Sequence, residues 1–406
     1  MTLLGKTIEK LAERSAFLGV AHRSRSNSWI SLAWMLGAFP VALVLLPFLS
    51  FLRFRGSPFR MMTLHTETAF TYLVLYLESI RGQYPTFKSY DLIAVLDKWS
   101  HETLCKLYAE ELSTRIIPRN GARGLVIQAL MLQPRFLVQV EHSDWSYTQR
   151  PFQQADAPLK VTSELQGLRA ETLRRAACFR DEYVALAVYT IDYDIQRAPY
   201  PGYWLVTENM ESNGLSLVDG IKYLHASGRD VLLLGSPDTG KAQVPLDLPR
   251  LADFGELGGA HEVALAAGCK YFWTDHVGAA YLAWPFKRPI LSTNTYSLRN
   301  RKHMMTGWWI LPTRFQSPSG REVTFREHLL SKPPPSKQRE LRWILNSPEE
   351  IVAAHSEMLA RLNGTFRESA VGATLQLRLR ALMNEFPEFG CNIPSSFLVS
   401  HPYLLE

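Results

Sequence analysis

Short apolar runs alternate along this chain with longer stretches in which apolar residues recur at helical spacing. That alternation predicts strands joined by helices, the order that builds a parallel sheet covered by helices. The sequence therefore predicts an α/β fold with two such series. The expected strands are Met61–His65, Tyr90–Leu96, Arg115–Pro118, Val184–Ile191, Val231–Leu234, Lys270–Trp273 and one starting at Arg288, and the expected helices are Thr68–Gly82, Ser100–Leu112, Ser163–Cys178, Leu215–Ala226, Glu262–Ala267 and Ala279–Phe286.

The stretch from His261 to Asn294 gives the clearest unit, because it reads as helix, strand, tight turn, helix and strand in succession. A helix that opens with Gly278 and Ala279 lets a ligand approach its unpaired N–H groups. Those groups and the helix dipole favour a phosphate or pyrophosphate. The other interpretation is one more βα unit of a parallel sheet, whose turn carries no ligand.

The amino end has a different pattern, since Ser26–Leu52 contains no charged side chain and is long enough to approach a bilayer thickness. Pro40 and Pro47 interrupt it, which favours a re-entrant hairpin or monotopic anchor over a straight spanning helix. Leu3–Leu18 before it has the pattern of an amphipathic helix that lies on an anionic membrane surface. The alternative is a buried apolar hairpin within a globular protein.

Ser347, Pro348 and Glu350 form a helix start, and the helix is expected to run to Leu362 and pack back across the domains. We therefore divide the chain into four parts. These are the membrane-associated helical segment 1–58, a Rossmann-like acceptor domain 59–180, a Rossmann-like nucleotide-sugar domain 181–330, and an extended segment with carboxyl-terminal helices, 331–406.

Composition narrows the class of partner. The chain is 47% hydrophobic and 20% charged, as a globular protein is, and its formal net charge is +6. It has no basic stripe interleaved with aromatic residues, so we expect contact with anionic lipid or phosphorylated substrates and none with nucleic acid. The four cysteines lack metal-site spacing and are expected to be free thiols.

Gly235–Lys241, GSPDTGK, nearly fits a phosphate loop after a strand. The following Ala242 lacks the hydroxyl that would hold magnesium, and Pro245 blocks the helix that should face the phosphates. This argues against nucleotide hydrolysis. A turn at the carboxyl end of a strand is still suited to ligand contacts from Gly235, Ser236 and Asp238.

Asp192-Tyr193-Asp194 matches the DxD pattern with which some glycosyltransferases hold a metal and a nucleotide diphosphate. The pattern is short, and a solvated strand end explains it equally well. A divalent metal is possible but not favoured, and no metal site is predicted.

His276 lies in the turn and can donate to a phosphate or act as a base, although a turn histidine can simply be exposed. Asp275 would repel a diphosphate, so it is a candidate for sugar hydroxyls. Arg314, beyond the following strand, is a candidate to neutralise a leaving phosphate, or else a surface cation. Trp308 and Trp309 are expected to be exposed, as an acceptor platform or an interface, and the oligomeric state is unknown.

Several segments together resemble a family of bacterial GT-B-type glycosyltransferases associated with surface polysaccharide. The resemblance covers most of residues 60–365 and lies in Thr63–Gly82, Gly228–Gly235, Cys269–Leu291, Glu322–Leu330 and Asn346–Leu362. It implies a GT-B-like architecture of two Rossmann-like domains facing a cleft, with the nucleotide-sugar held mainly by the second. Where relatives show Gly-Thr-Ser-Ser-Gly, Trp273–Gly278 keeps the threonine and the glycine. The relatives' His-x-Arg pattern is replaced by Ala187–Thr190, which removes a cation expected near the donor phosphate.

The leading hypothesis is a glycosyltransferase at the cytoplasmic face of the inner membrane, peripheral or monotopic, that moves a sugar from a nucleotide-sugar to a lipid-linked or cell-surface glycan. Thr274, His276, Gly278 and Ala279 would hold the diphosphate, so no metal or other cofactor is required. The base is left open among Asp192, Glu208 and His276.

Two other hypotheses stand beside it. One is a catalytically inactive, membrane-bound scaffold that retains the fold and positions other assembly enzymes. The other is a nucleotide-dependent transferase of a different group, such as sulfate, which only the near-match to a phosphate loop supports.

Overall fold

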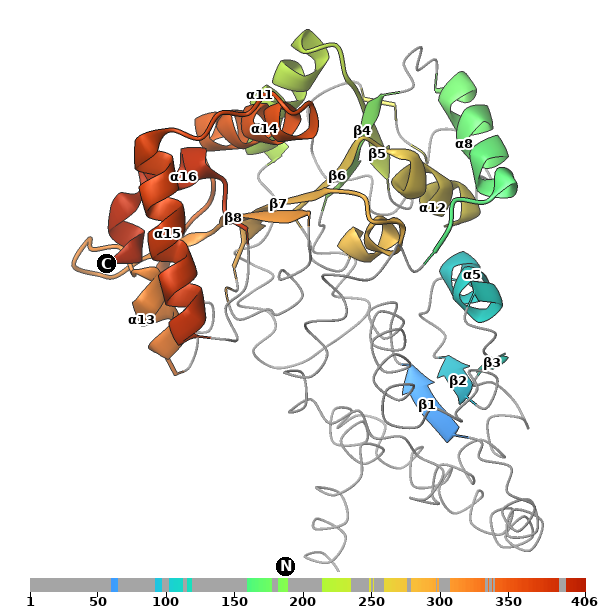
Figure 1. Ribbon diagram of the computed structural model, residues 1–406, viewed down its shortest axis with the longest axis horizontal. Coiled ribbons are helices and arrows are strands. Elements are labelled where there is room, and N and C mark those ends of the chain that lie inside the picture. The colour runs from blue at the N-terminus through green and yellow to red at the C-terminus, as the bar shows by residue number, and fades with distance from the viewer. Residues whose placement is uncertain are drawn as a thin grey trace, which may run out of the picture. The chain divides into compact units, whose positions relative to one another are not determined.

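A computed structural model of the chain describes the parts drawn as ribbons in Figure 1. These are residues 60–64, 92–96, 102–111, 115–118, 159–176, 182–188, 214–234, 248–249, 251, 259–275, 279–296, 298, 307–332, 335, 338, 340–386 and 392–406. The chain divides into two compact units, Met1–Ala155 and Asp156–Glu406.

The first unit contains a parallel sheet of three strands in the order β1-β2-β3. Helix α5 leads from β2 to β3, so the predicted βα order is confirmed here. The bounds are β1 Arg60–Leu64, β2 Leu92–Leu96, α5 Glu102–Glu111 and β3 Arg115–Pro118.

The predicted helix Thr68–Gly82 and the apolar segment Ser26–Leu52 both lie outside the described residues. Among the helices that are described, none combines the length and the apolarity needed to cross a bilayer. The membrane segment therefore stays a prediction.

The second unit is built on a five-stranded sheet in the order β5-β4-β6-β7-β8, in which every neighbouring pair is parallel. All side chains of β4, β6 and β7 are buried, as expected for strands covered on both faces. The bounds are β4 Tyr183–Ala187, β5 Asp230–Leu234, β6 Tyr271–Thr274, β7 Ile290–Thr295 and β8 Trp308–Pro312.

Helices cover both faces of this sheet. On one face α8 (Ser163–Arg175) packs against α12 (Gly259–Gly268), and on the other α11 (Gly214–Ala226) packs against α14 (Pro348–Leu362) (Figure 1). Helix α11 connects β4 to β5 and α12 connects β5 to β6, so successive crossovers lie on opposite faces. Because α8 packs on α12, it belongs to the second unit, which begins earlier than the expected domain start at residue 181.

The single helix expected over Ala279–Phe286 is wrong. The structure has two short 3₁₀ helices, η5 (Ala279–Leu282) and η6 (Trp284–Phe286), and the second ends at Lys287 in the left-handed conformation, with φ of 51°. Pro285 is the physical reason, because its ring has no N–H and clashes with the carbonyl four residues earlier in an α-helix. The chain therefore reaches β7 through two tight turns.

The predicted start of α14 is confirmed in detail. The Ser347 hydroxyl accepts a hydrogen bond from the Glu350 N–H at 3.2 Å, and the Glu350 carboxylate accepts one from the Ser347 N–H at 2.8 Å. This is the reciprocal capping box that the spacing of the two residues predicts. Helix α14 ends at Leu362, also as expected.

The remaining elements form a layer at the carboxyl terminus in which α15 packs on α16, and both contact η9. Strands β9 and β10, which precede these helices in the chain, pair as a two-stranded antiparallel ribbon. The bounds are β9 Arg314–Gln316, α13 Phe325–Leu330, β10 Arg342–Ile344, α15 Ala370–Glu385, α16 Ser395–Ser400 and η9 Pro402–Leu405.

The expected exposure of two tryptophans is wrong. Trp308 has no exposed surface, and its indole N–H donates to the Ser292 hydroxyl at 2.8 Å in the neighbouring strand. Trp309 is half-buried, with the Arg361 guanidinium 4.5 Å from its ring centroid. Both side chains are used within the fold, so neither offers the open aromatic platform that the sequence suggested.

Candidate strand-end site

The strand order of the second sheet defines where a ligand is expected. From β4 the chain crosses to β5 on one side, and then returns past β4 to β6 on its other side. The two connections leave β4 and β6 in opposite directions at their carboxyl ends. In open α/β sheets this topological switch point is where ligands bind.

Three of the residues predicted to bind the donor lie at this point. Thr274 is the last residue of β6, Asp275 follows it, and Ala279 opens η5. Thr274 is fully buried and Asp275 is 7% exposed. A fully buried hydroxyl cannot reach a ligand without movement of the chain, so Thr274 shapes the strand end from inside, while Asp275 lies at its rim.

Apart from Arg314, the other predicted site residues lie outside the described residues, so their roles stay predictions. They are Asp192, Glu208, Gly235, Ser236, Asp238, His276 and Gly278. Asp192 and Glu208 follow β4, and Gly235, Ser236 and Asp238 follow β5 in the chain. Because carboxyl ends of parallel strands share one edge of a sheet, the strands that precede these residues all end at the edge that holds Thr274.

The short helix η5 changes the predicted electrostatics of this turn. A dipole equivalent to about half a charge requires several aligned peptide units, and η5 spans only Ala279–Leu282. Any attraction for a phosphate must therefore come from individual N–H groups of the turn, with little help from a helix dipole.

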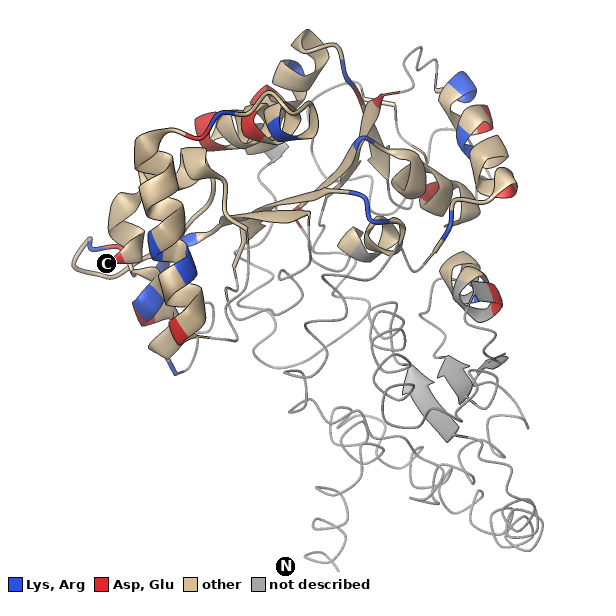
Figure 2. Ribbon diagram, in the orientation of Figure 1, with Lys and Arg blue, Asp and Glu red and all other residues tan. Residues whose placement is uncertain are grey.

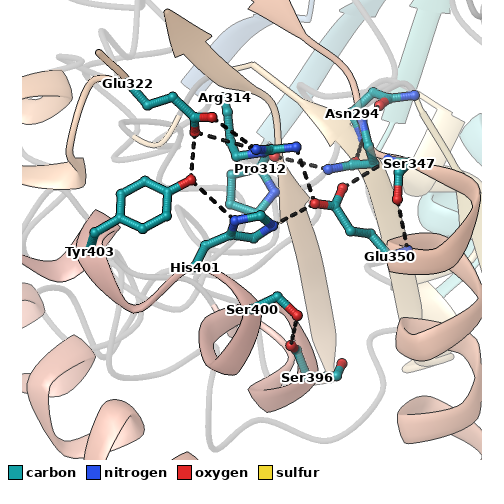
Figure 3. A network of polar contacts seen from close by, with 11 residues as sticks. Asn294, Pro312, Arg314, Glu322, Ser347, Glu350, Ser396, Ser400, His401 and Tyr403 are labelled. Carbon is teal, nitrogen blue, oxygen red and sulfur yellow. Dashed lines mark hydrogen bonds and ion pairs between the residues drawn. The ribbon is translucent and has the colours of Figure 1, made fainter. Parts of the chain in front are cut away.

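Arg314 has partners that the sequence did not predict. Its guanidinium lies 3.1 Å from Glu322 and 3.2 Å from Glu350, and its side chain is 13% exposed (Figure 3). Its charge is thus already balanced by two carboxylates. Arg314 is therefore a member of an ion-pair cluster within the fold.

The same cluster draws in the carboxyl terminus of the chain. His401 Nε2 lies 2.5 Å from Glu350, His401 Nδ1 lies 3.2 Å from the Tyr403 hydroxyl, and that hydroxyl donates to Glu322 at 2.8 Å (Figure 3). We call these five residues the Arg314 cluster. It joins β9, the start of α14 and η9 at one place.

Hydrogen bonds within the cluster act on the Glu350 carboxyl. A carboxylate only accepts, so His401 Nε2 donates to Glu350. Burial would raise the pKa of Glu350, but hydrogen bonds from His401 and the Ser347 N–H and the charge of Arg314 lower it below its ordinary value.

A second unpredicted feature lies at the carboxyl end of β7. Asn294 has φ of 51°, rare for a residue other than glycine, and the register of β7 against β8 shifts between Ser292 and Thr295. The Asn294 and Asn346 side-chain oxygens each accept from the other residue's N–H, at 2.8 and 2.6 Å, and Asn346 Nδ2 donates to the Pro312 carbonyl at 3.0 Å. This pair ties the ends of β7 and β8 to Asn346, the residue before the Ser347 cap of α14.

Part of this arrangement had a signal in the sequence. Asn294 lies near the end of the strand expected to start at Arg288, and asparagine is among the residues other than glycine that most readily adopt the left-handed conformation. Its pairing with Asn346, which directly precedes the predicted helix cap, joins residues that are distant along the chain. Only the folded chain brings them together. Among the described residues, no group of three or more His, Cys, Asp and Glu side chains is arranged to hold a metal ion.

Comparison with protein-family models and with curated proteins finds no match. Among solved structures the chain is similar to a glycosyl transferase family 9 protein from Veillonella parvula DSM 2008, with 12% identity, a TM-score of 0.44, and 75% of this chain and 98% of that chain covered. It is also similar to E. coli ADP-heptose lps heptosyltransferase II, with 13% identity, a TM-score of 0.43, and coverage of 75% and 99%. Likenesses of this degree do not decide a function.

Proposed function

We propose that the chain is a glycosyltransferase of the GT-B class that takes a sugar from a nucleotide-sugar donor, which the second unit binds. The acceptor is a lipid-linked or cell-surface glycan, and the protein acts at the cytoplasmic face of the inner membrane as a peripheral or monotopic protein. The amino-terminal segment 1–58 would supply the membrane contact.

One observation carries the proposal. The turn that the sequence marks for the donor begins at Thr274 and Asp275, and the strand order puts the switch point of the sheet at that same strand end. The two lines of reasoning are independent, because the first uses residue types and the second uses only the order of strands.

Different groups of the protein would bind the diphosphate and the sugar of the donor. The bond between the sugar C1 and the diphosphate oxygen breaks, a bond from an acceptor oxygen to C1 forms, and the acceptor proton passes to a base. Main-chain N–H groups of the turn up to Ala279 would bind the departing diphosphate, whereas the carboxylate of Asp275 suits the sugar hydroxyls. Asp192, Glu208 and His276 are the candidates for the base.

Binding experiments on one variant test this assignment. Asp275→Asn keeps the shape of the side chain and removes its charge. We expect it to weaken binding of the nucleotide-sugar at least tenfold, the scale of a charged hydrogen bond, while affinity for the free nucleoside diphosphate stays the same or rises. A panel of nucleotide-sugars, screened by thermal stabilisation of the purified chain, identifies the donor first.

Glu182→Gln is the matched control, because it removes one carboxylate at the opposite edge of the same sheet. Glu182 precedes β4 and pairs with Arg229 at 2.8 Å and Lys270 at 3.1 Å. It should leave donor affinity unchanged. If Asp275→Asn binds the donor as the parent does, or if no nucleotide-sugar or nucleoside diphosphate stabilises the protein, the proposed donor site is wrong.

The inactive scaffold is the second candidate, favoured by the cation that this chain lacks where its relatives have His-x-Arg. Turnover separates the two: an enzyme transfers the sugar, or hydrolyses the donor slowly without acceptor, and releases nucleoside diphosphate. A scaffold binds the donor and releases none.

A further inference from the structure

The exposed apolar side chains of this protein gather in one part of the fold. Among the described residues the large apolar side chains that are exposed are Leu330 at 61%, Val371 at 59%, Leu377 at 61% and Val399 at 44%. All lie on α13, α15 or α16. Single exposed apolar residues are ordinary, but α15 carries two of them.

Helix α15 has two apolar sides. Leu375, Leu379 and Leu382 point inward and are buried. On the outward side Ala373, Leu377 and Ala381 follow one another at intervals of one turn, and all are exposed. Exposure of this apolar stripe to water is unfavourable.

Basic residues flank this stripe. Arg378 and Arg380 lie about 100° and about 60° around the helix from Leu377, on its two sides. Both are exposed, and neither forms an ion pair with another described residue. The one acidic residue of α15, Glu385, is paired with Arg326 of α13. The unmatched charge of the helix is therefore that of two arginines, coloured blue in Figure 2.

We propose that the outward face of α15 docks on an anionic lipid surface. Leu377 would enter the boundary between headgroups and acyl chains, and Arg378 and Arg380 would reach lipid phosphates on either side. Long basic side chains bury their stems and keep their charge at the headgroups, and apolar stripes between them are the pattern of interfacial helices.

Charge favours lipid over a second copy of the chain. In a two-fold symmetric contact the same face meets itself, so the arginines of one copy would approach those of the other. Helix α15 offers no free carboxylate to match them, because Glu385 is already paired. An anionic bilayer supplies the missing negative charge.

Photo-cross-linking of the full chain tests the proposal independently of any contact made by the amino-terminal segment. A photoreactive amino acid replaces Leu377, and in a control it replaces Lys222, which is 65% exposed on α11. The protein is mixed with vesicles of phosphatidylcholine, with or without phosphatidylglycerol. We expect a lipid adduct at position 377 that needs phosphatidylglycerol, and none at position 222. Adducts at both positions, lipid adducts at neither, or an adduct between two protein chains at position 377 would overturn the proposal.

Charge variants give the second readout. Arg378→Gln with Arg380→Gln should lower the lipid adduct at position 377 about 30-fold, since each basic residue near an anionic surface is worth about fivefold. The matched control, Arg174→Gln with Arg175→Gln, removes the same charge from the exposed end of α8 and should change nothing. An equal decrease in both pairs would mean that net charge alone drives the contact. Unchanged thermal midpoints show that both pairs fold.

Discussion

Arg314→Met distinguishes two possible roles of one residue. The sequence suggests that Arg314 binds the donor, whereas in the structure it forms ion pairs with Glu322 and Glu350. Methionine keeps much of the length of the side chain and removes its charge. We expect the variant to lose stability and to keep its affinity for the nucleotide-sugar.

The contacts in the structure set the size of the effect. At an effective dielectric constant of about 20, two unit charges 4 Å apart attract by about 4 kcal/mol, and Arg314 has two carboxylate partners. The cost of removing its guanidinium from water offsets part of that gain. Breaking a buried ion pair by deleting one partner costs about 3–5 kcal/mol, and the side chains of Arg314, Glu322 and Glu350, at 13%, 18% and 10% exposed, keep some contact with solvent. We therefore take the low end, about 3 kcal/mol.

Urea unfolding, followed by the fluorescence of the buried tryptophans, measures this loss. With an m value of about 3 kcal/mol/M, the midpoint should fall by about 1 M. Arg321→Met is the control, because Arg321 pairs with Glu327 at 2.8 Å but is 62% exposed, and its midpoint should barely move. A normal midpoint for Arg314→Met together with weaker donor binding would refute the reasoning and return Arg314 to the donor site.

Three further predictions concern the second unit. A Cβ at Gly220 would lie 2.9 Å from Ile351 Cγ2, whereas Gly167 has open space, so Gly220→Ala should be less stable than Gly167→Ala by about 2 kcal/mol in urea unfolding; equal stabilities would contradict the packing. Burial lowers the pKa of His355 from 6.5 to about 3, so between these pH values the unfolded chain binds more protons than the folded chain. The free energy of unfolding should therefore fall as the pH is lowered from about 6.5. His355→Gln should make the free energy of unfolding depend less on pH between pH 7 and pH 5. Ser347→Ala should cost about 1 kcal/mol, measured by the same unfolding, and no loss would mean that the cap contributes nothing.

Local features of the sequence predicted most of the described elements. The buried strands from Tyr183 to Thr274 are continuous apolar runs, and the Ser347 cap needs only residues within one turn of each other. Such features act between neighbours in the chain, so the sequence shows them directly.

The two errors have different physical causes. Trp308 is apolar in bulk with one polar atom, and whether it is exposed depends on Ser292 in the next strand, which the sequence cannot place. The single helix expected over residues 279–286 is wrong for a local reason. Pro285 interrupts it, and the prediction gave more weight to the spacing of the apolar residues than to this proline.

The sequence by itself determined the α/β class, the order of the strands along the chain and the turn after Thr274 as the place to look for a ligand. Only the tertiary structure decided the order of those strands in the sheet, and with it the switch point between β4 and β6. It also decided that Arg314 and His401 both contact Glu350. The reason is that strand pairing and ion pairing join groups far apart in the chain, and their partners are chosen by packing of the whole fold, not by neighbouring residues.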